Sequence, residues 1–157
     1  MLSQMQRLSA EAEGRYATDE ELRFLAEYLS SYELRLQTYQ KLQQMEAGLL
    51  QKAYEKLVAQ EPGMFRSGAT DLTTKWKRDT VRILRFSVTA LLINDLDSHQ
   101  EKMLLWFQSI ARAVNVQKSC NLTYTALQEI IRPHLTEPQA NLFLPILEMN
   151  RRTLANL

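Results

Sequence analysis

A row of cations beside a tryptophan is the part of the sequence best suited to chemistry. The segment TTKWKRDTVRILRF, residues 73–86, spaces four basic residues by three, four and three positions, which places them along one edge of a helix. Guanidinium groups bind carboxylates and phosphates through paired hydrogen bonds, and an indole offers a flat face for stacking. The residues that this pattern offers as an anion-binding site are Lys75, Trp76, Arg78, Asp79, Arg82 and Arg85.

The same row of cations also fits a solvated helix face that pairs with acidic side chains elsewhere. A lone tryptophan such as Trp76 is most often a core or interface residue. Asp79 is either an ion-pair partner for the neighbouring arginines or an acceptor for N–H groups of a ligand. The residue pattern leaves both interpretations open.

No other segment carries a recognisable catalytic or metal-binding pattern. His99 and His134 stand alone, without a second ligand at metal-binding spacing, and the position of His99 at a helix start favours a solvated, polar role. Cys120 has no base in its local sequence, which favours an inert thiol. Trp106 lies in an apolar segment and is expected in the core. Because no phosphate-binding loop, nucleophile elbow or carboxylate pair is found, we expect a non-enzymatic protein.

Composition indicates one globular domain. The chain has 157 residues, of which 45% are hydrophobic and 24% charged, and its formal net charge of +1 argues against a nucleic-acid binder. One cysteine excludes an internal disulfide framework and fits a reducing compartment. The longest apolar run, residues 90–93, is too short for a transmembrane segment, and no targeting segment is visible. We therefore expect a soluble, intracellular protein.

Hydrophobic spacing of three and four predicts an all-α chain of about seven or eight helices. The Thr18–Glu21 capping box opens a long helix that Pro62 stops, with a bend or junction expected at Ser30–Ser31. A loop over 61–70 leads to a helix capped by Thr70 or Asp71. The other expected helices cover 3–13, 98–114, 122–132 and 136–156, with a loop at 115–121 and a kink at Pro145.

Four stretches of the chain resemble the phycobiliprotein family, the globin-like light-harvesting subunits related to allophycocyanin. The stretches are GRYATDEELRFLAEYLSSYELRL, QKAYEKLVAQEPGMFRSGAT, WKRDTVRILRFSVTALLIND and KMLLWFQSIARAVNV. The first resembles the family's Arg-Tyr opening, and the third resembles the helix that carries the chromophore. The resemblance implies a single globin-like domain over 1–157, with a helical extension at 1–31 and a core at 32–157.

The resemblance also implies a tetrapyrrole site that has lost its covalent anchor. Trp76 stands where the family has the cysteine that forms the thioether to the bilin. Arg78 and Asp79 stand at the family's Arg-Asp pair, which binds a propionate and the pyrrole nitrogens, and Arg85 stands at a later arginine. Arg82 replaces one of the family's paired tyrosines, and Cys120 does not match the usual attachment position.

A chromophore-less family member, such as a bilin-biosynthesis-associated globin, is therefore the leading hypothesis. It implies transient non-covalent binding of bilin, and a bilin-synthesis enzyme or phycobilisome component as partner. The alternative is a ligand-free structural subunit that forms homo- or heterodimers through its N-terminal helices. A third hypothesis is a haem-binding sensor that uses His99 or His134. The resemblance implies a cytoplasmic protein and leaves association with the thylakoid surface open.

Overall fold

The computed structural model describes residues 1–156, and helices account for most of them, which confirms the predicted all-α fold. The helices are α1 (Leu2–Glu11), α2 (Asp19–Gln60), α3 (Thr73–Ile93), α4 (Leu96–His99), α5 (Leu105–Ala113), α6 (Gln117–Ile131) and α7 (Glu137–Ala155). A π-helical segment, Gln100–Leu104, joins α4 to α5, and a 3₁₀ turn, Arg132–His134, follows α6.

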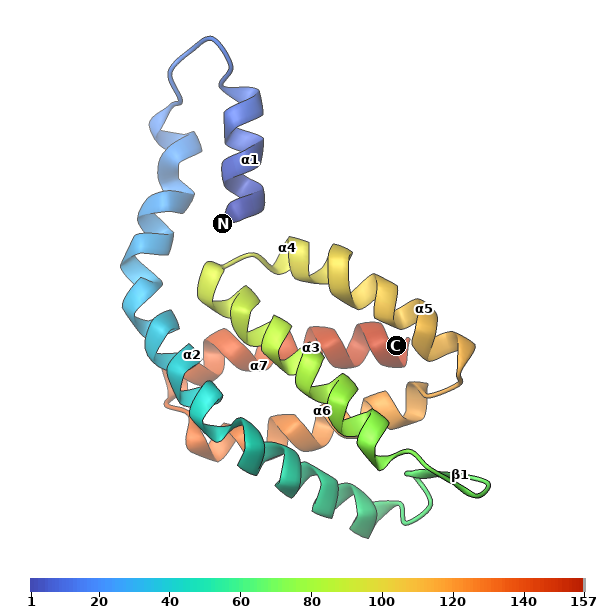
Figure 1. Ribbon diagram of the computed structural model, residues 1–157. Coiled ribbons are helices and arrows are strands. Elements are labelled where there is room, and N and C mark those ends of the chain that lie inside the picture. The colour runs from blue at the N-terminus through green and yellow to red at the C-terminus, as the bar shows by residue number, and fades with distance from the viewer. Residues whose placement is uncertain (157) are drawn as a thin grey trace.

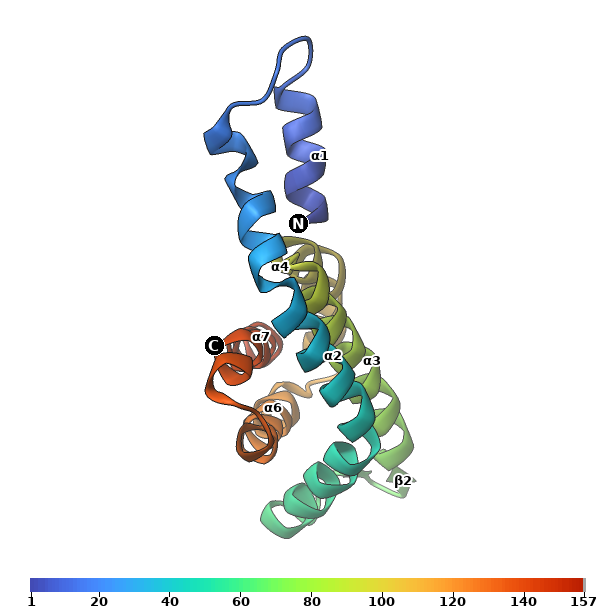
Figure 2. The same cartoon turned by 90° about the vertical axis from the view of Figure 1, so that its left-hand side faces the viewer.

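The helices form a globular body from which an N-terminal hairpin projects. Figure 1 shows α1 and the start of α2 as this hairpin, at the end of the molecule near α4. In the perpendicular view of Figure 2, α2 and α3 run side by side, and α6 and α7 lie together on the other side of the body. The core lies where α2, α3, α6 and α7 meet.

Helix α2 begins where the sequence predicts but is not interrupted at the predicted junction. Thr18 and Glu21 form the reciprocal capping box. The hydroxyl of Ser30 donates to the Glu27 carbonyl at 2.8 Å, and that of Ser31 contacts the Glu27 and Tyr28 carbonyls. Because both hydroxyls bond to carbonyls of the preceding helical turn, the helix continues through the pair. Figure 1 shows a long curved helix.

The predicted loop over 61–70 contains a small β-hairpin that hydrophobic alternation did not indicate. Strand β1 (Arg66–Ser67) pairs antiparallel with β2 (Thr70–Asp71). Gly68 has φ +60°, a conformation that costs glycine little. The Asp71 carboxylate then accepts the Thr73 N–H at 2.8 Å, but the N-cap residue of α3 is Leu72 rather than Thr70 or Asp71 as predicted.

The predicted loop over 115–121 was wrong, because α6 begins at Gln117. The turn is shorter since Asn115 adopts a left-handed conformation, with φ +55°, and Val116 donates its N–H to the Ala111 carbonyl at 3.0 Å. Helix α4 begins at Leu96, two residues before the predicted start at Ser98. The Asp95 side chain caps it by accepting the Ser98 N–H. Helix α7 continues as one element through Pro145.

Two predictions about single side chains were also wrong. His99 is buried rather than solvated, with 4% of its surface exposed, because α4 packs against α3 and places the ring in the interior. Trp106 is 50% exposed rather than in the core. Its helix, α5, instead buries Ala111, and the indole lies on the outer surface of the molecule.

Candidate functional site

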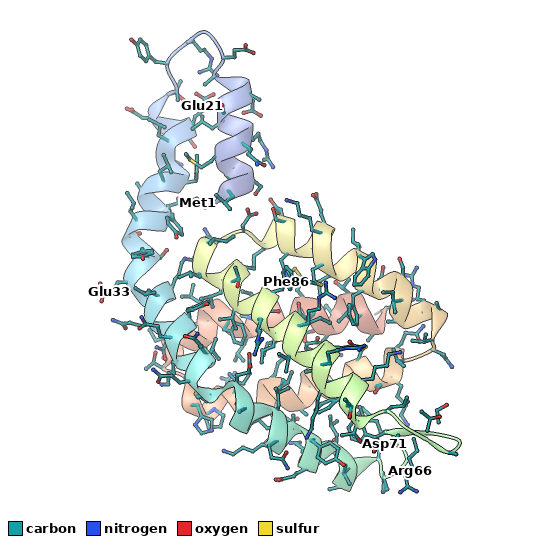
Figure 3. All side chains as sticks on the ribbon, viewed as in Figure 1. Met1, Glu21, Glu33, Arg66, Asp71 and Phe86 are labelled. Atoms are coloured by element: carbon teal, nitrogen blue, oxygen red, sulfur yellow. The ribbon has the colours of Figure 1, made fainter. Side chains whose placement is uncertain are left out.

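A cavity of about 560 Å³ lies beside Trp76. The N-terminal half of α3 forms one wall, residues 63–67 with strand β1 a second, and the end of α5 with the start of α6 a third. Figure 3 labels Arg66 and Asp71 on the hairpin, next to the beginning of α3. Two parts of the chain that are distant in the sequence, one leading into α3 and the other spanning the α5–α6 turn, thus surround one space.

Trp76 forms a fixed part of the cavity wall. Its indole ring packs edge-on against Phe65, with ring centroids 5.1 Å apart, and lies 6.2 Å from the Tyr54 ring. The indole N–H donates to the Thr123 hydroxyl at 2.9 Å. This hydrogen bond ties α3 to α6 and leaves the ring surface, but not the indole N–H, available to a ligand.

The cation row does not converge on the cavity. Of the six predicted site residues, Lys75, Trp76 and Asp79 line it, whereas the three arginines do not. A helix turns about 100° per residue, which places Trp76 and Asp79 on the inward side of α3 and the arginines on the outward side. Lys75 points in nearly the same direction as Arg82, seven residues later, and lines the cavity because it lies nearer the start of α3.

Each arginine has a partner, and only that of Arg78 lines the cavity. Arg85 forms two hydrogen bonds with the Glu46 carboxylate, at 2.6 and 2.8 Å. The Arg82 guanidinium lies 5.6 Å from the centre of the Trp106 ring, and Arg78 forms an ion pair with the adjacent Asp79 at 3.1 Å. Arg78 and Arg85 are thus exposed and paired with carboxylates, whereas Arg82 contacts an aromatic ring.

Two cations that sequence reasoning missed lie at the cavity. Arg66 comes from β1, and Lys118 comes from the first turn of α6, where its ammonium group pairs with Glu61 at 2.7 Å. With Lys75 they place three cations among the lining residues. Lys118 was overlooked because its segment was predicted to be a loop, and no signal in the sequence links it to α3.

The interior of the cavity is mostly neutral. Burial raises the pKa of the Cys120 thiol to about 11, with the Asp79 carboxylate as a further cause. Burial also raises the pKa of Tyr124 well above its ordinary value. Since the thiolate is the nucleophilic form of cysteine, Cys120 is an unreactive thiol at neutral pH. The cavity combines this neutral interior with cations on its lining.

Neither histidine lines the cavity. His99 uses its Nε2 atom for Asn150 in the core, and His134 is exposed on the 3₁₀ turn. Among residues 1–156, no group of three metal-ligating side chains comes together. In the same part of the chain, no helix is long and apolar enough to cross a membrane.

The comparison with protein families agrees with this architecture. The model of the phycobilisome protein family matches residues 8–154, which is nearly the whole chain. The chain therefore belongs to the phycobilisome protein family, whose members are generally structural or light-harvesting subunits rather than enzymes. No protein with a curated description matches it.

Proposed function

We propose that this chain is a non-enzymatic phycobilisome-family protein that holds a linear tetrapyrrole non-covalently in the cavity beside Trp76. In this role it serves bilin biosynthesis or phycobilisome assembly. The observation that carries the proposal is the cavity itself, with an aromatic wall on one side and cations among its lining residues. Family membership supports the choice of ligand, because phycobiliproteins carry bilins.

The size and chemistry of the cavity fit such a ligand. Its volume of about 560 Å³ lies within the range of small-molecule pockets, roughly 300–1,000 Å³. A bilin has an apolar conjugated body, acidic propionates and pyrrole N–H groups. The Trp76 ring matches the conjugated body, the Lys75 and Arg66 cations match the propionates, and the Asp79 carboxylate matches the pyrrole N–H groups.

Non-covalent binding follows from the position of the thiol. By the family resemblance, Trp76 stands where the family has its attachment cysteine, and its hydrogen bond to Thr123 holds the indole in the wall. Cys120 also lines the cavity, but its high pKa keeps it protonated. Addition of purified protein to biliverdin or phycocyanobilin should therefore shift the visible spectrum, and the pigment should separate from the chain on denaturation. An unchanged spectrum at micromolar concentrations would refute the ligand proposal.

A test of the propionate contact compares two exposed cations of α3. Lys75→Ala removes a cation that lines the cavity, and we expect bilin affinity to fall about tenfold, the usual scale for one charge-assisted hydrogen bond. Arg85→Ala removes a cation that is bound to Glu46 outside the cavity, so affinity should stay unchanged. Spectroscopic titration of both variants measures the difference. Equal losses of bilin affinity in the two variants would show that the net charge of the protein, and not the position of Lys75, determines binding.

A second candidate function, that of a ligand-free assembly subunit, is favoured by the N-terminal hairpin. None of residues 1–37 is buried. Several large apolar side chains are exposed there, namely Leu2, Met5, Leu22, Leu29 and Tyr32. Contiguous exposed apolar surface marks interaction sites. We propose that the extension, residues 1–31 with the adjacent turn of α2, forms a homo- or heterodimer interface.

The hairpin is held in place at its base. Ser3 donates its N–H and its hydroxyl to the Asp95 carboxylate, at 3.0 and 2.7 Å. Tyr28 and Arg35 donate to the Leu92 and Leu91 carbonyls at the end of α3. These contacts present the apolar side chains in a defined orientation, which a specific interface requires.

Leu29→Glu tests the interface. Leu29 is 72% exposed, so a charge there should not disturb the isolated fold, but it should weaken a dimer about tenfold or more by entering an apolar contact. Gln40→Glu adds the same charge at an exposed position further along α2 and should leave association unchanged. Light scattering over a concentration series measures both. A monomeric unaltered chain would refute the homodimer, and pull-down would then test a heterodimer.

We also propose that the partners are bilin-synthesis enzymes or phycobilisome components, and that the protein works in the cytoplasm near the thylakoid surface. Family membership supports oligomeric assembly with phycobilisome components. Purification of the tagged chain from cells tests this proposal. Recovery of bilin-synthesis enzymes would support a role in biosynthesis, and recovery of phycobilisome components would support a role in assembly.

A further inference from the structure

The core contains a titratable side chain that neither the cavity nor the hairpin uses. His99 is the last residue of α4 and is 4% exposed. We propose that His99 is a proton-sensitive lock: its neutral ring holds the segment from α4 to α5 against α3 and α7, and acidification releases that segment.

The ring belongs to a buried polar chain that crosses three helices. The Nε2 atom of His99 lies 2.9 Å from Asn150 Oδ1 on α7 and 3.4 Å from Ser87 Oγ on α3. Asn150 donates its amide N–H to Ser87 Oγ at 2.7 Å, and Ser87 donates its hydroxyl to the Ile83 carbonyl at 2.8 Å. Each donor in this chain has an acceptor when the His99 proton is on Nε2 and the ring is neutral.

Protonation would break this balance. Among the described residues, His99 Nδ1 is a buried atom without a hydrogen-bond partner. In the neutral ring this atom is an acceptor without a donor, whereas the imidazolium carries an N–H there without an acceptor, in addition to a buried charge. Both effects oppose protonation of the folded state.

The surroundings offer the imidazolium no counter-ion. The groups that face the ring are the Ser87 hydroxyl from α3 and the Asn150 amide from α7, and neither carries charge. On the neighbouring part of its own segment, Asp97, Glu101 and Lys102 are exposed, and no carboxylate among the described residues forms an ion pair with the ring. Burial lowers the pKa of His99, and the Asn150 contact only partly offsets this effect.

A hinge lies directly after the lock. The π-helical segment Gln100–Leu104 begins at the residue that follows His99 and leads into α5. Such segments interrupt the regular hydrogen-bond ladder of a helix and often lie at functional positions. Because Phe107 and Ile110 of α5 line the cavity, release of this segment would move one cavity wall. This last consequence rests on the proposed function, whereas the lock itself does not.

The sign of the pH effect follows from the lowered pKa. The unfolded chain binds a proton at a histidine pKa of about 6.5, and the folded chain binds it only at lower pH. The contribution of His99 to stability is therefore fully present above the unfolded-state pKa of about 6.5 and is lost as the pH falls below it. If the ring stays neutral in the folded chain, the folding equilibrium constant at about pH 5.5 should be about tenfold lower than at neutral pH. Carboxylates of the unfolded chain have pKa values of about 3.9–4.3, so their contribution to the pH dependence of stability begins at lower pH.

The two histidines provide a matched test. Wild type, His99→Gln and His134→Gln are unfolded with urea at about pH 7.5 and about pH 5.5, and hydrogen exchange is followed in residues 96–113. Glutamine keeps an N–H donor but does not titrate. We expect wild type and His134→Gln to show the tenfold loss, with lower protection factors in this segment at the lower pH once the intrinsic exchange rate at each pH is taken into account. His99→Gln should show neither pH effect, whatever its stability at the higher pH.

The proposal is overturned if His99→Gln keeps the full pH-dependent loss. It is equally overturned if the His99 ring of the wild type titrates near 6.5 by NMR without any change in exchange of this segment. Should His99→Gln fail to fold, the NMR titration of the wild-type ring decides the matter alone. Neither measurement uses bilin, so failure of the lock and failure of the proposed ligand are distinguishable.

Discussion

Phe143→Ala is expected to lower the free energy of unfolding by about 3–5 kcal/mol, the usual range for a buried phenylalanine. Phe143 is 0% exposed and lies on α7, within the main hydrophobic cluster that includes Leu91, Leu127 and Leu147. Since these side chains come from three different helices, they cannot all shift inward to fill the space. The loss combines transfer of the ring to water with the cavity that remains. Urea unfolding followed by circular dichroism measures it.

Phe86→Ala is the matched control for this substitution. Phe86 is 45% exposed on α3, so its removal leaves no closed cavity, and we expect a loss of less than about 1 kcal/mol. Comparable losses in the two variants would contradict the assignment of Phe143 to the core and of Phe86 to the surface.

The second large effect is expected from Trp76→Ala, which should cost about 3 kcal/mol and should weaken bilin binding about tenfold or more. The substitution removes the ring contacts with Phe65 and Tyr54. It also leaves the hydroxyl of Thr123, which is 3% exposed, without the indole N–H. The cavity becomes larger, but it loses the flat wall on which a conjugated ligand would stack.

Trp106→Ala provides the comparison for both measurements. The Trp106 indole is half exposed and contacts Phe107 and the Arg82 guanidinium, so we expect a stability loss of less than about 1 kcal/mol and unchanged bilin affinity. Urea unfolding and spectroscopic titration give the two results. If both tryptophans affected affinity equally, the cavity beside Trp76 would not be the binding site.

Helix positions could be predicted from the sequence because the determining interactions are local. The Thr18–Glu21 capping box and the break at Pro62 act within a few residues, and both bound α2 as expected. Local patterns were less informative at the turn before α6, where Asn115 alone reverses the chain and leaves Gln117 free to begin the helix.

The candidate site could be predicted only in part. Of the six residues predicted as one site, Lys75, Trp76 and Asp79 line the cavity, whereas Arg78, Arg82 and Arg85 do not. Direction on the helix sets Trp76 and Asp79 apart from the three arginines, but only the position of Lys75 near the start of α3 distinguishes it from Arg82.

The sequence alone thus determined the all-α architecture and the family resemblance. Only the tertiary structure decided that Arg66 and Lys118 join Lys75 at the cavity, that Trp106 faces outward and that His99 is buried against Asn150. The physical reason is the range of the interactions. Capping and periodicity depend on neighbours within one or two helical turns, whereas burial, ion pairing and cavity formation depend on side chains from helices that are distant in the chain.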